Sequence, residues 1–156
     1  MDWTGWVVFG LVATTVLTGT MVAAQLTGLS RMDLPLILGL FVTQKPDLAR
    51  FAGFLIHLVN GQVFALLYAG AFSSIGRAEW WMGAAFGLLH GLLALTVLLP
   101  MATAVHPRMS TERSGPDLAL LEPPGPLALH YGRETPIVTL LAHVLYGAIL
   151  GGFLRP

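Results

Sequence analysis

Four long apolar segments separated by short polar ones dominate the pattern along this chain. They cover about residues 5–28, 51–72, 80–105 and 136–154. Each is close to the ~20 residues that an α-helix needs to cross the hydrocarbon core of a membrane. The pattern therefore predicts an all-α fold, an integral membrane four-helix bundle in which residues 1–156 form a single transmembrane domain.

The composition supports the same class. Hydrophobic residues make up 55% of the 156 residues and charged residues only 10%, and the mean hydropathy is +0.75. A soluble domain carries about 25% charged residues, so the lipid bilayer is the expected surrounding. The 8 Lys and Arg residues are balanced by 8 Asp and Glu residues, which leaves no cationic excess for a nucleic acid. The absence of cysteine excludes disulfides and thiolate metal sites.

The segments between the spans differ in character. Residues 33–42 are apolar but too short to span, so we expect a re-entrant or interfacial segment that packs against the bundle. The loop at 106–134 is rich in proline and is expected to be extended and irregular. Within the third span, Pro100 is expected to kink or end the helix, because proline lacks a backbone N–H and clashes with the preceding turn.

The distribution of cations predicts the topology of a multi-pass protein of the cell membrane. Cytoplasmic loops carry an excess of Lys and Arg. The first loop carries Arg31, Lys45 and Arg50, the third carries Arg108, Arg113 and Arg133, and the opposite side has only Arg77 and Arg155. Loops one and three are therefore expected in the cytoplasm and both termini outside.

The second and fourth spans resemble each other, as a duplicated helical hairpin would produce. Residues 54–61 and 140–147 share the pattern His-x-x-polar-Gly. Small residues also recur every fourth position, which lets helices approach closely in a membrane. These positions are Gly53, Gly61, Ala65 and Ala69 on the second span, Gly83, Gly87 and Gly91 on the third, and Gly147 and Gly151 on the fourth. Such faces are expected to point inward or towards a partner protein.

Three histidines are the only residues inside the spans whose side chains titrate near neutral pH: His57, His90 and His143. Counted from the same membrane side, His57 and His143 lie at nearly equal depth, with His90 at most about one turn deeper. His57 and His143 also lie on the small-residue faces, so they should face the bundle. These two are candidate ligands of a haem b, and all three are candidate ligands of a metal ion. A proton relay is a further alternative, and hydrogen bonds to neighbouring helices would explain them without any ligand.

Two functions follow, from different classes. No carboxylate lies inside a span and no nucleophile motif is present, so an enzyme is not favoured. The favoured interpretation is a non-catalytic integral membrane subunit that packs against a larger membrane complex, such as a respiratory complex, or against copies of itself. The alternative is a haem- or metal-binding electron-transfer or sensing protein that uses the intramembrane histidines.

Several short motifs also resemble a known family. They are Met32-Asp33-Leu34-Pro35, the His-x-x-x-Gly-x-x-Phe-Ala-Leu-x-Tyr pattern from His57 to Tyr68, and the His-x-x-Tyr-Gly-x-x-Leu-Gly pattern from His143 to Gly151. The chain resembles a family of small four-helix membrane proteins of bacteria and archaea whose function is unknown. The resemblance implies the four-span architecture and implies no reaction or cofactor.

Overall fold

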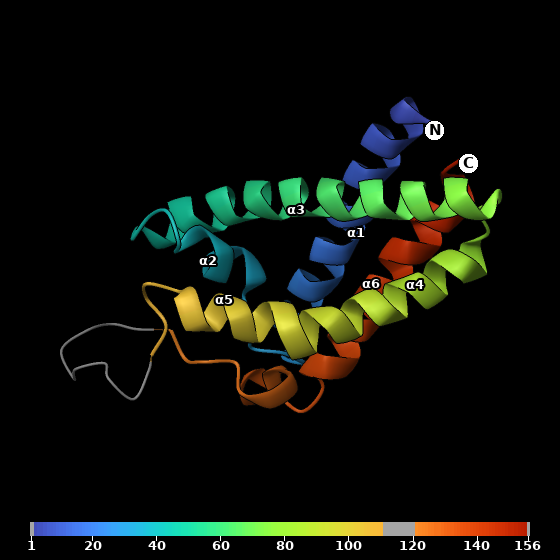
Figure 1. The fold of residues 1–156 in the computed structure, drawn as a ribbon. Coiled ribbons are helices and arrows are strands. Elements are labelled where there is room, and N and C mark those ends of the chain that lie inside the picture. The colour runs from blue at the N-terminus through green and yellow to red at the C-terminus, as the bar shows by residue number, and fades with distance from the viewer. Residues whose placement is uncertain (1, 111–120, 156) are drawn as a thin grey trace.

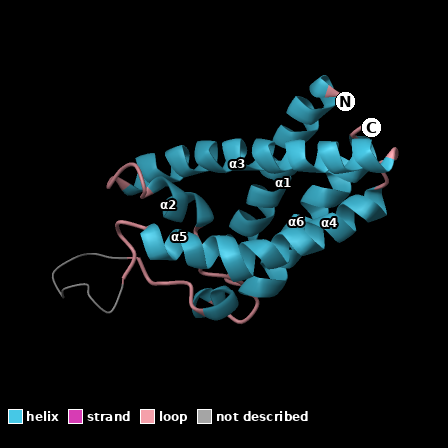
Figure 2. Ribbon diagram, viewed as in Figure 1, coloured by secondary structure: helices cyan, strands magenta, loops and turns pink. Residues whose placement is uncertain are grey.

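The computed structural model describes residues 2–110 and 121–155. It contains four helices that are long and apolar enough to cross a membrane (Figure 1). The first, second and fourth spans are α1 (Trp3–Leu26), α3 (Pro46–Ile75) and α6 (Thr135–Phe153). The third runs from Trp80 to Val105 as α4 (Trp80–Leu93), a π-helical turn η1 (Ala94–Leu98) and α5 (Leu99–Val105). Helices form nearly all the regular structure of the described residues (Figure 2), and the predicted all-α four-span class is confirmed.

The helix α6 lies at the centre of the arrangement. It packs against α4 and α1, and α1 packs in turn against α3. Both termini lie at the same end of the molecule as the α3–α4 connection (Figure 1). The first and third loops meet at the other end, where the Arg31 guanidinium lies 3.1 Å from the Glu122 carboxylate. The cytoplasmic orientation of that end stays a prediction.

Close contact between α4 and α6 depends on glycine. A Cβ atom on Gly83 would lie 2.0 Å from the carbonyl oxygen of Gly147, and a Cβ on Gly147 would lie 2.0 Å from that of Gly83. Gly87 approaches the carbonyl of His143 in the same way, at 2.2 Å. The glycine faces of α4 and α6 are therefore used inside the chain, where backbones touch directly.

The apolar stretch at 33–42 forms a short helix, α2 (Leu34–Gly39), that packs against the first half of α3. The Asp33 carboxylate caps it by accepting a hydrogen bond of 3.0 Å from the Leu36 N–H. At its other end the Arg108 guanidinium donates to the carbonyl of Leu40. The His106 ring lies 2.9 Å from the carbonyl of Ile37. As expected, this non-spanning segment packs against the bundle.

The third span does not end at Pro100. The π-helical turn at 94–98 comes directly before it, and the helix then continues to Val105. A proline ring clashes with the carbonyl four residues earlier, and a wider π turn is one way to relieve that clash within a helix. The turn is part of the wall of the cavity described below.

Aromatic rings separate α3 from α4, although the two helices are joined by a short connection. Phe72 stacks on Phe86 with ring centroids 5.6 Å apart, and Tyr68 meets Phe86 edge-on at 6.0 Å. The backbones of α3 and α4 consequently make few contacts, whereas α1 packs directly against α6. A two-fold axis between duplicated hairpins would make these two pairs equivalent, so the packing departs from that symmetry.

The described parts of the proline-rich loop, 106–110 and 121–134, fold back on the bundle. A short helix, η2 (Pro126–Tyr131), leads into α6. The Tyr131 hydroxyl donates to the carbonyl of Glu122 at 2.5 Å. Burial, with a smaller contribution from the Glu122 carboxylate, raises the pKa of Tyr131 to about 12. Residues 111–120 of the predicted loop lie outside the described residues.

Candidate intramembrane ligand site

All three intramembrane histidines line one cavity of about 320 Å³. His57 comes from α3, His90 from α4 and His143 from α6, and residues of α1, α2, η1 and α5 complete the walls. This volume is at the lower end of the range of about 300–1,000 Å³ for small-molecule sites. The structure therefore brings together the three side chains that the depth count placed near each other.

The hydrogen bond of His143 defines its tautomer. Its Nδ1 atom lies 2.7 Å from the carbonyl oxygen of Thr139. A carbonyl only accepts hydrogen bonds, so Nδ1 carries the proton and donates it. A neutral imidazole has a single N–H group, and Nε2 of His143 therefore carries a lone pair.

His57 reaches the same state through Thr18. Its Nδ1 atom lies 2.8 Å from the Thr18 hydroxyl, and that hydroxyl also lies 2.8 Å from the carbonyl of Thr14. The hydroxyl has one proton. Both contacts contain a proton only if Thr18 donates to the Thr14 carbonyl and accepts from His57. Nδ1 of His57 is then the donor, and Nε2 again carries a lone pair.

The cavity therefore holds two imidazoles whose accepting nitrogens are free. Among the described residues, no hydrogen bond engages Nε2 of His57 or of His143. Each ring is fixed by a donated Nδ1–H, the arrangement that orients metal-ligating histidines in general. A hydrogen-bond donor or a cation in the cavity would find two nitrogen lone pairs.

His90 is held by its neighbours' rings. It stacks on Phe64 with ring centroids 3.9 Å apart and meets His143 edge-on at 4.7 Å. Its Nδ1 atom is one of the few buried side-chain polar atoms that have no partner among the described residues, together with the Tyr68 hydroxyl and Gln62 Oε1. The centroids of the His90 and Tyr68 rings are 6.1 Å apart. Leaving a polar atom unpaired in hydrocarbon costs free energy. This wall of the cavity therefore has polar atoms that lack hydrogen-bond partners within the described residues.

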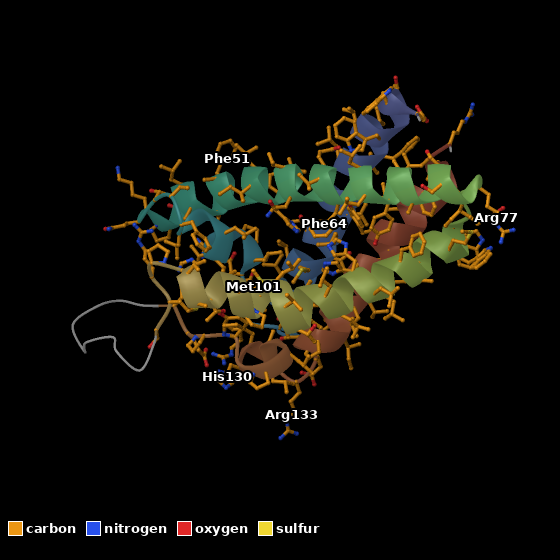
Figure 3. The ribbon with its side chains drawn as sticks, viewed as in Figure 1. Phe51, Phe64, Arg77, Met101, His130 and Arg133 are labelled. Atoms are coloured by element: carbon orange, nitrogen blue, oxygen red, sulfur yellow. The ribbon has the colours of Figure 1, made fainter. Side chains whose placement is uncertain are left out.

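The cavity is only partly enclosed. Its lining residues Asn60 of α3 and Leu98 of η1 are exposed, and α3 packs little against α5, so we place the opening between α3 and the α5 half of the third span. The Phe64–His90 stack bounds it towards α4, and Leu34 and Leu38 of α2 bound it at the other end. Figure 3 shows Phe64 on the side of α3 that faces the third span. Asn60, an exposed side chain of α3, also borders the cavity. An opening between two membrane spans faces lipid.

The remaining lining is apolar. Met, Leu, Ala and Phe side chains predominate, and no Lys, Arg, Asp or Glu lines the cavity in the part of the chain that the structure describes. In the same part of the chain no three His, Asp or Glu side chains are grouped so that they could hold one metal ion. A haem b would bring two propionate carboxylates, for which these walls offer no cation.

Sequence reasoning anticipated the histidines but missed the walls of the site. The π-helical turn and α5 contribute Leu98 and Ala102, and α2 contributes Leu34 and Leu38. The Tyr146 hydroxyl, 2.6 Å from the carbonyl of Gly61, ties α6 to α3 beside the cavity. The apolar pattern of 33–42 and the position of Pro100 were the available signals for these walls, but neither indicates which way the side chains face.

Comparisons with protein-family models, with curated proteins and with solved structures give no match for this chain. The four-span membrane architecture follows from the structure itself. The resemblance to a particular family stays a prediction.

Proposed function

We propose that this protein is a non-catalytic membrane protein that binds a lipid-soluble small molecule in the cavity between α3 and α5. One observation carries the proposal: two oriented imidazoles, His57 and His143, present free Nε2 atoms inside an apolar cavity that opens towards lipid. Ligand sites combine apolar walls with a few placed polar groups in this way. The absence of charged lining residues in the described chain favours a neutral ligand.

A site without a ligand is the competing explanation, in which the histidines only hold helices together. That explanation accounts for Nδ1 of His57 and His143, which bond Thr18 and Thr139. It leaves without a role the Nε2 atoms and the Nδ1 of His90, which have no partner among the described residues. Buried polar groups in native proteins nearly always have partners, so a ligand accounts for more of the site.

A haem or metal ion is the second candidate, because a histidine that donates Nδ1–H to a carbonyl and exposes Nε2 is the usual metal-binding form. The visible spectrum and metal content of the protein, purified from membranes in mild detergent, test this candidate. A strong haem band or stoichiometric metal that disappears in His143→Ala would establish it in place of an organic ligand.

The role as a subunit of a larger complex also stays a prediction. Its expected contact surfaces were the glycine faces, and those of α4 and α6 are used within the chain. A ligand-binding subunit would satisfy both predictions, so the two are not exclusive.

Photolabelling tests the cavity directly. Neutral probes that carry a diazirine on an alkyl chain of about ten carbons, roughly one leaflet long, would be added to the protein in lipid nanodiscs. We expect saturable labelling of peptides that line the cavity. Ala102→Phe, which fills the mouth, should abolish it, whereas Ala104→Phe, on the exposed face of the same helix and outside the cavity, should not. Labelling that never saturates, or that ignores Ala102→Phe, would refute the proposal.

A further inference from the structure

We infer that the ligand of this cavity is a lipid-soluble alcohol or phenol, a molecule whose polar end donates hydrogen bonds. This inference rests on the proposed function and narrows its ligand class. It follows from which polar atoms the protein has already used and which it leaves in the cavity.

The N–H groups of His57 and His143 already donate hydrogen bonds within the protein. Nδ1–H of His143 is given to the Thr139 carbonyl at 2.7 Å, and Nδ1–H of His57 to the Thr18 hydroxyl at 2.8 Å. The Thr18 proton in turn is used by the Thr14 carbonyl. Each histidine can therefore offer only an acceptor, Nε2, to a neutral ligand.

Three hydroxyl groups beside the cavity also use their protons within the protein. The Tyr146 hydroxyl donates to the Gly61 carbonyl at 2.6 Å. The Thr14 hydroxyl donates to the Gly10 carbonyl at 2.7 Å, and the Thr139 hydroxyl to the Thr135 carbonyl at 2.8 Å. The donors that remain in the described lining are the single N–H of the neutral His90 ring and the Asn60 amide. The protein supplies no proton to Nε2 of His57 or of His143 in that part of the chain.

A ketone, ester or ether head could accept from the His90 N–H, but it has no proton to donate to Nε2 of His57 or His143. A hydroxyl head instead supplies the missing proton to Nε2 of His57 or His143. A site whose polar groups require a hydroxyl rejects the analogue that lacks it, because its own groups are then left unpaired. The absence of Lys, Arg, Asp and Glu from the described lining disfavours a charged head in hydrocarbon.

The position of the mouth sets the orientation of the ligand. His143 is buried on α6, whereas the lining residues Asn60 of α3 and Leu98 of η1 are exposed. The hydroxyl end therefore enters first, and the apolar remainder extends through the gap between α3 and α5 towards lipid. Phe64, stacked on His90, offers an aromatic wall along this path.

A matched pair of probes tests the inference: a diazirine-bearing primary alcohol with an alkyl chain of about ten carbons and its methyl ether. Competition photolabelling in nanodiscs would give the affinity of each, compared at equal amounts dissolved in the membrane. We expect the alcohol to bind at least about tenfold more tightly than the ether. In the double variant His57→Leu/His143→Leu, with both acceptors removed, this preference should disappear.

A milder variant and the wild-type protein keep the test valid if the double variant does not fold. The single variant His143→Gln retains an amide oxygen as acceptor and should keep a preference for the alcohol. If the leucine variant does not fold, the comparison of alcohol with ether on the wild-type protein still decides the inference.

The outcomes separate the inference from the proposed function. Equal binding of alcohol and ether, blocked by Ala102→Phe, would overturn the donor requirement and leave a ligand cavity. Saturable binding of neither probe would overturn both. Displacement of the alcohol by Zn²⁺ or Cu²⁺, with metal bound at one ion per chain, would overturn the inference in favour of a metal site on the same nitrogens.

Discussion

Replacing Gly147 with alanine should separate α4 from α6 and destabilise the protein. The new Cβ would lie 2.0 Å from the Gly83 carbonyl oxygen, whereas ordinary carbon–oxygen contacts are about 3.3 Å or more. The helices must therefore move apart by roughly 1.3 Å at their crossing. Both contacting groups belong to backbone, so no side-chain rotation relieves the clash. Overpacking of this kind costs about 1–3 kcal/mol.

The measurement is the free energy of unfolding in mixed micelles, titrated with SDS and followed by circular dichroism. Gly19→Ala and Gly70→Ala are matched controls in other spans, because a Cβ there meets no atom within 4 Å. They should be neutral or stabilising by up to ~1 kcal/mol, since alanine favours helix more than glycine does. The reasoning is refuted if Gly147→Ala is as stable as these controls.

A double variant adds a sharper check. Gly83 and Gly147 each contact the other's carbonyl, so the first alanine already opens the gap that the second requires. The loss in Gly83→Ala/Gly147→Ala should be smaller than the sum of the two single losses. Additive losses would mean that the two glycines do not share one contact.

Three further predictions concern the loops. The pKa of Tyr131 is raised from 10.0 to about 12, so the stability that this tyrosine contributes is fully present below pH 10 and is lost as the pH rises from 10 to about 12. The difference in unfolding free energy between the wild type and Tyr131→Phe should therefore shrink over this pH range. A difference that does not change with pH would contradict the prediction. Arg108→Ala removes the bond to the end of α2, so amides of residues 34–42 should exchange about tenfold faster, while Arg133→Ala, at an exposed residue, should not change them. A cysteine at Ser110 should be shielded from an impermeant reagent on intact cells and one at Ser74 labelled; the reverse would invert the predicted topology.

Much of the fold is predictable from this sequence because its strongest constraint is local. Each span must satisfy its own backbone groups within the membrane, so length and hydropathy alone locate four helices. The glycine periodicity on α4 and α6 likewise indicates close packing. The glycine periodicity does not indicate which helix packs against that face. The same sequence pattern would suit a neighbouring span of this chain or a helix of another protein.

The site was only partly predictable for the same reason. Equal depth along their helices placed His57 and His143 near each other, since rise per residue is a local quantity. The separation of α3 from α5, which creates the cavity, is a tertiary property. It depends on the Phe64–His90 stack and on α2 occupying the space beside α3, and no periodicity in the chain encodes either distance.

Because the proposed opening lies between two membrane spans, the ligand concentration that governs binding is the concentration in the bilayer. A ligand that arrives through the bilayer is sampled at its mole fraction among the lipids, whatever its solubility in water. Each added methylene group is worth about 0.8 kcal/mol of transfer into hydrocarbon, so a homologous series would gain roughly fourfold per carbon in affinity measured against the aqueous phase without touching Leu98, Ala102 or any other lining residue. Detergent micelles in excess would dilute such a ligand away, and membrane composition itself would be the variable to which occupancy responds.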